Sequence, residues 1–237
     1  EKFQEQKFGK LTDQQLLQLY KNFNKKYRQL YVWGWFPLVV DAHNEYFSSK
    51  VIKNFKQFLN KKNKINKFTE YFSVLSYFPA ISDREKAQLD LIKLKENKIN
   101  IDDYLKKYGW LTFNWCGPVY QRKNLMSDLK NISKNQPDKN KIRDIKFRQK
   151  QIIRELKLSQ RLIKEFEVLA RLSYLKDYRK NIIYQANYNI SFLLAEIARR
   201  LKYPRYLLHY ILPQEMAAVM QRKIVKKELE PRYRFSV

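Results

Sequence analysis

The stretch that most constrains the fold is 159–203, which contains no Gly or Pro. Its apolar residues recur at steps of three and four, the spacing that keeps side chains on one face of a helix. The ten positions of this seam are Leu169, Leu172, Lys176, Arg179, Ile183, Ala186, Ile190, Leu193, Ile197 and Leu201. Pro204 follows, and the residue before a proline disfavours helical backbone. We therefore expect one long helix over about 159–203.

The rest of the chain also favours helices over strands. The 237 residues include only four Gly and seven Pro, few for a β fold with many turns. We find no internal repeat and no sustained alternation of apolar and polar residues. With 44% hydrophobic residues, the chain can bury a substantial core. We predict an all-α fold, an irregular multi-helix bundle built around the long helix. We expect 1–237 to form a single all-α domain that belongs to a larger protein.

Local motifs predict where several other helices begin. Two segments have the spacing of a capping box, and a third residue is a typical N-cap; these are Thr12 with Gln15, Ser82 with Glu85, and Asn100. Further helices are expected over about 38–59 and 142–158. The short aromatic segment 68–79 fits either a helix or a strand, and we favour a helix because no partner strand is evident. Short helices are expected to start near Pro204 and Pro213. The charged, Asn-rich segments 60–67 and 134–141 are expected to be loops.

The chain is strongly basic, with 49 Lys and Arg against 23 Asp and Glu and a formal net charge of +26. Such a charge is compatible with a polyanionic partner, and a nucleic-acid-binding module is the alternative function. Lys outnumbers Arg, and Asn, Ile, Tyr and Phe are abundant, a combination typical of AT-rich codons. Codon bias spreads charge over the surface, whereas a nucleic-acid site gathers it on one face. Both interpretations stay open at this point.

Two cations, Lys176 and Arg179, occupy seam positions where apolar residues are expected. In one interpretation their aliphatic stems pack and their charged ends pair with carboxylates of neighbouring helices. In the other, the seam opens onto an anion. Arg179 would then bind the anion through its planar guanidinium, and Lys176 would contribute a compact ammonium charge. Together with Asp177, these are the first candidate substrate-binding residues.

A second candidate is the aromatic segment that contains Tyr108 and Trp110. Such a segment is either a turn that lines the core or a platform on which a base or nucleotide stacks.

Cys116, the only cysteine, excludes an internal disulfide and a Cys-rich zinc site. His43 lies between Asp41 and Glu45, but helical backbone would spread these three side chains, so no metal site is predicted.

Other functional classes lack their motifs. The sequence contains no P-loop, GxGxxG, HExxH or GxSxG pattern, so we assign no catalytic residue and no cofactor to this chain. The longest apolar run, 31–40, is far shorter than the roughly 20 residues of a membrane span. We therefore expect no membrane partner. A single cysteine fits a reducing compartment, and we expect a cytoplasmic protein.

Several segments together resemble the helical central region of phosphoenolpyruvate-utilising enzymes, in particular the phosphoenolpyruvate synthase-like group. They are TDQQLLQLYKNF, FTEYFSVLSYFP, SDREKAQL, DDYLKKYGWLTFNWCGP, YLKDYRK and AEIARRLKYP followed by YILPQEM. In that family, such a region lies between an ATP-grasp domain and a swivelling domain that carries a phosphorylated His. This chain departs from the family in lacking a Thr-x-Gly-Gly-x-x-x-His motif.

The resemblance therefore implies a kinase-associated helical piece of a phosphotransferase that is not catalytic alone. It is either a scaffold or linker domain or a substrate-side domain. ATP and Mg²⁺ would be bound elsewhere, and the partners would be the ATP-grasp and phosphohistidine domains of the same protein. If a phosphorylated small molecule also binds, Arg179 and then Lys176 are the residues expected to hold it.

Overall fold

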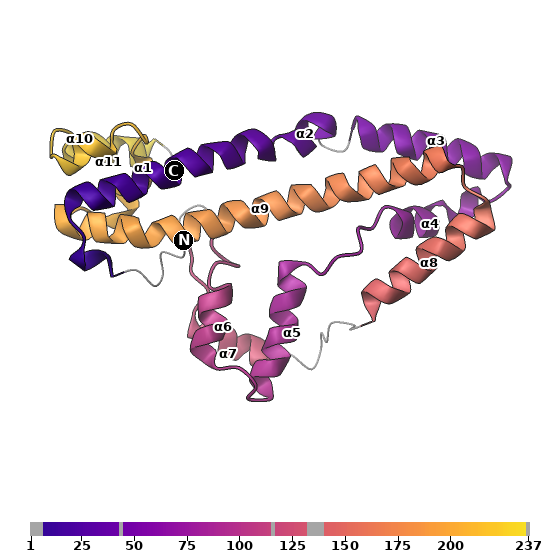
Figure 1. Ribbon diagram of the computed structural model, residues 1–237, viewed down its shortest axis with the longest axis horizontal. Coiled ribbons are helices and arrows are strands. Elements are labelled where there is room, and N and C mark those ends of the chain that lie inside the picture. Colours follow the sequence, from indigo (N-terminus) through magenta and orange to yellow (C-terminus); the bar gives the residue numbers. More distant parts are fainter. Residues whose placement is uncertain (1–6, 43–44, 115–116, 132–139, 236–237) are drawn as a thin grey trace. The chain divides into compact units, whose positions relative to one another are not determined.

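The computed structural model describes residues 7–42, 45–114, 117–131 and 140–235. Within these ranges every regular element is a helix, which confirms the all-α class (Figure 1). The α-helices are α1 (Asp13–Gly34), α2 (Phe36–Val40), α3 (Phe47–Lys61), α4 (Phe68–Leu75), α5 (Asp83–Lys95), α6 (Ile101–Tyr108), α7 (Arg122–Asn131), α8 (Lys141–Leu156), α9 (Gln160–Leu201), α10 (Met216–Met220) and α11 (Lys226–Arg234). The 3₁₀ helices with described bounds include η2 (Phe8–Lys10), η4 (Ile65–Lys67) and η6 (Arg205–Tyr210). None of the described helices combines the length and the apolar character needed to cross a membrane.

The long helix α9 confirms the expectation for 159–203. Most of its predicted seam is buried, and Leu193 and Ile197 are 0% and 1% exposed. The helix ends at Leu201 because Lys202 adopts left-handed backbone with a φ of 58°. The Tyr203 amide then donates to the carbonyl of Ala198, as in a helix C-cap.

The predicted capping motifs are confirmed. The Thr12 amide donates to Gln15 Oε1 over 2.8 Å, and the Gln15 amide donates back to Thr12 Oγ1 over 3.2 Å. Ser82 and Glu85 form the same reciprocal pair at the start of α5. Asn100 Oδ1 accepts from the third amide of α6. Each motif satisfies amides that the first turn of a helix leaves without an intrahelical partner.

One predicted helix is wrong in its extent. We expected a continuous helix over about 38–59, but the structure divides this segment into α2 and α3. The break lies at Asp41, whose backbone leaves the helical region with φ −150° and ψ 63°. Its carboxylate instead accepts hydrogen bonds from Ser48, in the first turn of α3. A tertiary role of one side chain therefore outweighs helix continuation.

Two smaller differences concern loops. The structure contains α7, for which the sequence analysis assigned no helix; its only buried residue is Leu125, so its apolar pattern is weak. The predicted loop 60–67 is shorter than expected, because α3 continues to Lys61 and η4 forms a 3₁₀ turn. Most of the predicted loop 134–141 lies outside the described residues.

The chain divides into two compact units. Unit 1 comprises Glu1–Tyr31, Ile99–Ser127 and Ile182–Val237, and unit 2 comprises Val32–Lys98 and Asp128–Asn181. The first part of α9 therefore belongs to unit 2 and its last part to unit 1. That 1–237 behaves as a single domain stays a prediction.

Unit 1 packs the end of α9 against α1 and the C-terminal helices. Its main core cluster contains Leu16 and Tyr20 of α1 and Leu207, Val219 and Leu229 from the segments after α9. Arg200 connects this core to the N-terminal segment. Its guanidinium donates to Asp13 Oδ1 over 2.7 Å and to the Phe8 carbonyl over 3.0 Å.

In unit 2, the start of α9 packs against α3, α4 and α8 (Figure 1). Phe55 of α3 meets Phe166 of α9 edge to face, with ring centroids 4.9 Å apart. The remaining buried residues of this cluster come from these four helices and from the segment between α8 and α9; they are Val51, Leu59, Tyr71, Leu75, Ile152, Leu156, Leu158 and Leu169. This core fixes the start of α9, on the N-terminal side of the candidate cations.

Candidate functional site

Lys176 lies on α9 and reaches Asp41, which follows α2. Its Nζ donates to Asp41 Oδ2 over 3.0 Å and to the Asp41 carbonyl over 2.7 Å. Asp41 is 1% exposed, and its carboxylate also accepts from the Ser48 amide and hydroxyl over 2.9 and 2.7 Å. One carboxylate therefore connects the end of α2, the start of α3 and the middle of α9.

The electrostatics of Asp41 favour its ionised form. Burial alone would raise its pKa, but hydrogen bonds from Ser48 and from Lys176 outweigh burial and hold the pKa below its usual range. A buried carboxylate that stays charged needs a paired cation. Lys176 supplies that cation. This contact agrees with the first interpretation of its seam position, pairing with a carboxylate of a neighbouring segment, and not with the binding of an external anion.

Arg179 lies one helical turn further along α9 and packs on the end of α1. Its guanidinium carbon is 5.6 Å from the centre of the Trp35 ring, within the range of a cation–π contact. Its stem lies on the backbone of Gly34, where an added Cβ would be 2.7 Å from Arg179 Cδ. Only glycine leaves room for this approach. Among the described residues, Arg179 forms no hydrogen bond or ion pair, and its Nε is buried.

Asp177 does not share a surface with Arg179, because residues two apart on a helix point to opposite faces. It is exposed and lines a hollow of about 210 Å³ together with residues of α5. In this hollow Asp83 accepts from Asn181 Nδ2 over 3.2 Å and pairs with Lys86 over 2.9 Å. The structure therefore does not bring the three predicted residues of α9 into one site.

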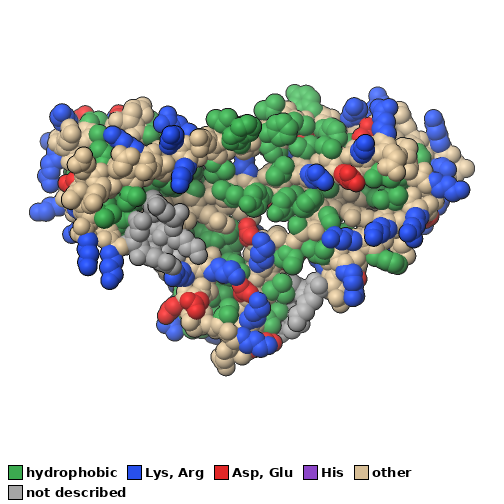
Figure 2. All heavy atoms as spheres, in the orientation of Figure 1, with side chains coloured by type: hydrophobic (Ala, Val, Ile, Leu, Met, Phe, Trp, Pro, Cys, Tyr) green, Lys and Arg blue, Asp and Glu red, His purple; other side chains and the backbone are tan. Residues whose placement is uncertain are grey.

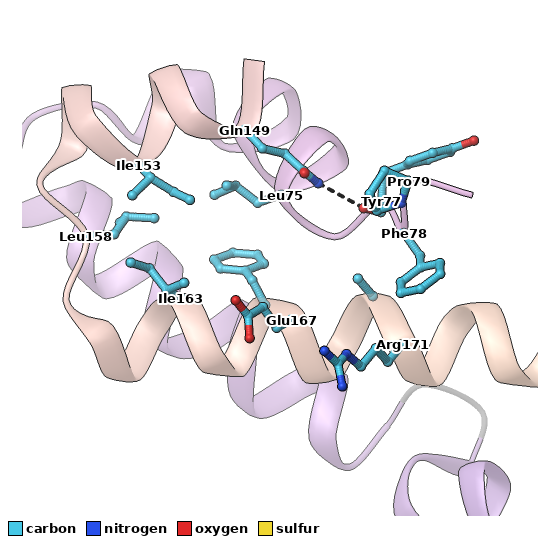
Figure 3. A pocket seen from close by; sticks show the side chains of 12 residues that line it. Leu75, Tyr77, Phe78, Pro79, Gln149, Ile153, Leu158, Ile163, Glu167 and Arg171 are labelled. Carbon is cyan, nitrogen blue, oxygen red and sulfur yellow. Dashed lines mark hydrogen bonds between the residues drawn. The ribbon is translucent and has the colours of Figure 1, made fainter. Parts of the chain in front are cut away.

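A second hollow in unit 2, which no sequence motif predicts, has a volume of about 240 Å³ (Figure 3). It lies between α8, α9 and the segment after α4, and its walls are mainly apolar; they include Leu75, Phe78, Pro79, Ile153, Leu158 and Ile163. Gln149 Nε2 is already used in donating to the carbonyls of Val74 and Tyr77, both over 2.9 Å. The hollow can receive an apolar group but offers few polar atoms that converge on one.

Tyr108 and Trp110 are packed inside unit 1 rather than presented to solvent. They are 3% and 7% exposed, and Trp110 Nε1 donates to the Lys107 carbonyl. Trp110 belongs to a cluster with Phe113 and Tyr188. The structure thus places both rings as the core-lining interpretation expects, and neither offers a free face for stacking. Trp115 and Cys116 lie outside the described residues.

The structure provides no support for a metal centre in the part of the chain that it describes. No group of three His, Cys, Asp or Glu side chains is arranged there to hold an ion. His43 lies outside the described residues, and Asp41 is engaged by Lys176 and Ser48. Burial lowers the pKa of His209, so this half-buried histidine is neutral near pH 7.

The feature that the sequence analysis missed is an exposed apolar surface of unit 2, which we call the aromatic face. It consists of Val32, Trp33, Trp35, Phe36, Val39 and Tyr46. Trp33 and Val39 are 77% and 75% exposed. Figure 2 shows hydrophobic side chains gathered over α2. The only sequence signal was the apolar run 31–40, which also fits a buried turn.

Comparisons of the chain with protein-family models, with curated proteins and with solved structures gave no match.

Proposed function

We propose that the chain is a helical scaffold domain of a phosphoenolpyruvate synthase-like phosphotransferase, and that its chemistry is carried by other domains. The observation that carries this proposal is the internal use of Lys176. A residue expected to grip a substrate anion holds Asp41 and, through it, the junction of α2 and α3.

This arrangement favours the scaffold over the substrate-side alternative. A site for a phosphorylated molecule needs cations that are close together and not already neutralised. Lys176 is neutralised by Asp41, and Asp177 lies on another face of α9. Of the two predicted cations, only Arg179 has no carboxylate partner among the described residues, and its Nε is covered. A long helix with such internal anchors is suited to holding other domains at a fixed spacing.

The nucleic-acid alternative receives no support from the visible surface. On the face shown in Figure 2, Lys and Arg side chains are scattered rather than gathered into one stripe. Scattered cations are what codon bias produces, whereas a nucleic-acid site concentrates them. As part of the proposal, we place the protein in the cytoplasm, where a single cysteine stays reduced.

The reading frame that encodes 1–237 tests the proposal. We expect it to continue into an ATP-grasp segment on one side and into a segment with a Thr-x-Gly-Gly-x-x-x-His motif on the other. A start codon directly before Glu1 together with a stop codon directly after Val237 would refute the proposal.

A matching biochemical test uses the protein encoded by the complete frame. Replacement of the Lys176–Asp41 pair by Met and Asn should leave the affinity for phosphoenolpyruvate unchanged. A rise in its Kd of tenfold or more, in a variant that is still folded, would restore the substrate-side hypothesis.

A further inference from the structure

The aromatic face is larger than a soluble protein usually leaves exposed. An aromatic side chain has a surface area of about 150–250 Å². From their exposed fractions, the four aromatic residues of the aromatic face together expose roughly 500 Å². The two valines bring the surface close to the roughly 800 Å² that each partner buries in a standard protein–protein interface. Apolar patches of this size mark sites where another molecule binds.

The local charge pattern indicates which kind of molecule this is. The chain carries +26 charges, yet 29–49 is its longest stretch without any Lys or Arg. Anionic lipid and nucleic acid are both held by cations that flank the apolar or aromatic contacts. The aromatic face lies within the stretch from which such cations are missing. A second copy of the chain would bring two surfaces of like net charge together, which opposes association.

The composition of the aromatic face matches the centre of a protein interface. Such centres are enriched in Trp, Tyr, Phe and Arg and depleted in Lys. Trp33, Phe36 and Tyr46 supply exposed rings, and Arg179 supplies a guanidinium that lies over the Trp35 ring. Residues of these types contribute most of the free energy of binding in measured interfaces.

Arg179 also indicates what the partner carries. The ring of Trp35 is the only group of the described residues that meets its charge, and no carboxylate of those residues pairs with it. Arg binds carboxylates through two parallel hydrogen bonds, which a partner can provide once water is displaced. We propose that the aromatic face docks a protein surface that is apolar at its centre and places a carboxylate beside Arg179. The inference does not depend on the proposed phosphotransferase role.

The probe for this docking is a labelled helical peptide with Leu along one face and Glu along the other. A second peptide carries Gln in place of every Glu. Binding to the complete chain is followed by fluorescence anisotropy at about 0.15 M salt, which screens long-range attraction to the net charge. The two exposed residues that we replace are Trp33 and Phe36, each by Ser. The matched control is Phe147→Ser, because Phe147 is 63% exposed and Phe36 is 62% exposed, and Phe147 lies on α8 of the same unit.

We expect Trp33→Ser and Phe36→Ser to weaken binding of the Glu peptide by about tenfold or more, as for interface hot spots. Phe147→Ser should change the Kd by less than about twofold. Arg179→Met should remove the preference for Glu over Gln while leaving most of the apolar affinity. Circular dichroism checks that each variant is folded.

Several outcomes would overturn the inference. Equal losses in Phe147→Ser and Phe36→Ser would mean that the peptide is held by non-specific attraction. Equal binding of the Glu and Gln peptides by the wild type would remove the role of Arg179. Vesicles of phosphatidylcholine with phosphatidylglycerol that bind the wild type but not Phe36→Ser, without peptide binding, would assign the face to a membrane. Self-association that Phe36→Ser abolishes would assign it to a second copy.

Discussion

Replacement of Lys176 by Met tests the structural role of the cation in the long helix. The substitution leaves Asp41, which is 1% exposed, without its cation. Breaking a buried ion pair by removing one partner costs about 3–5 kcal/mol. Asp41 keeps two hydrogen bonds from Ser48, so we expect a loss near the lower end, about 3 kcal/mol of unfolding free energy.

The assay is urea unfolding followed by circular dichroism near pH 7. Lys164→Met is the matched control, because Lys164 is exposed on the same helix and should change stability by less than about 0.5 kcal/mol. The double variant Asp41→Asn with Lys176→Met removes both charges and should be more stable than Lys176→Met alone. A loss below about 1 kcal/mol in Lys176→Met, the value for an exposed pair, would refute this reasoning.

The same variant has a characteristic dependence on pH. In the wild type, folding lowers the pKa of Asp41. The stability that ionised Asp41 contributes is therefore fully present above its pKa in the unfolded chain, and it is lost as the pH falls through its pKa in the folded protein. Without Lys176, burial is less opposed and the pKa of Asp41 rises. Stability of the variant should then increase, relative to wild type, between about pH 7 and about pH 4. If the difference in unfolding free energy between wild type and Lys176→Met did not become smaller over this pH range, the result would contradict the proposed role of Lys176.

Three further predictions concern unit 1 and the net charge. Gly109→Ala should lower the unfolding free energy by about 1–3 kcal/mol, because an added Cβ would be 2.5 Å from Tyr188 Oη. The control is Gly9→Ala, where an added Cβ would have no atom within 4 Å and stability should not change in the same urea titration. Hydrogen bonds from Arg199 and Arg200 hold the pKa of Glu196 at about 2. Unfolding free energy should therefore fall more steeply below about pH 5 in wild type than in Glu196→Gln. Single-stranded RNA should bind weakly at about 0.1 M salt, and a steep, saturable interaction in a salt titration would instead favour the nucleic-acid alternative.

Local patterns in the sequence were sufficient to predict the long helix and the capped starts of α1, α5 and α6. These features depend on residues three or four positions apart, so the sequence order alone contains them. The break at Asp41 could not be predicted in this way. Asp41 is held there by Ser48 and also by Lys176, which is 135 positions away in the chain.

The candidate site was predicted only in part. The two seam cations were correctly singled out as unusual, and the sequence left their pairing open because their partners are distant. Arg179 rests on Gly34 and Trp35, a contact that no local pattern signals. The exposure of the aromatic face was also unpredictable, because Trp33 and Phe36 belong to an apolar run that equally fits a buried turn.

The central claim is that the cations of the long helix serve the fold and a protein surface rather than a substrate anion. Nuclear magnetic resonance of isotope-labelled side chains measures this directly, through the Nε signal of Arg179 and the Nζ signal of Lys176 during a phosphoenolpyruvate titration. The account predicts no saturable shift of either signal. A saturable shift of both, with a Kd below about 1 mM, would contradict it.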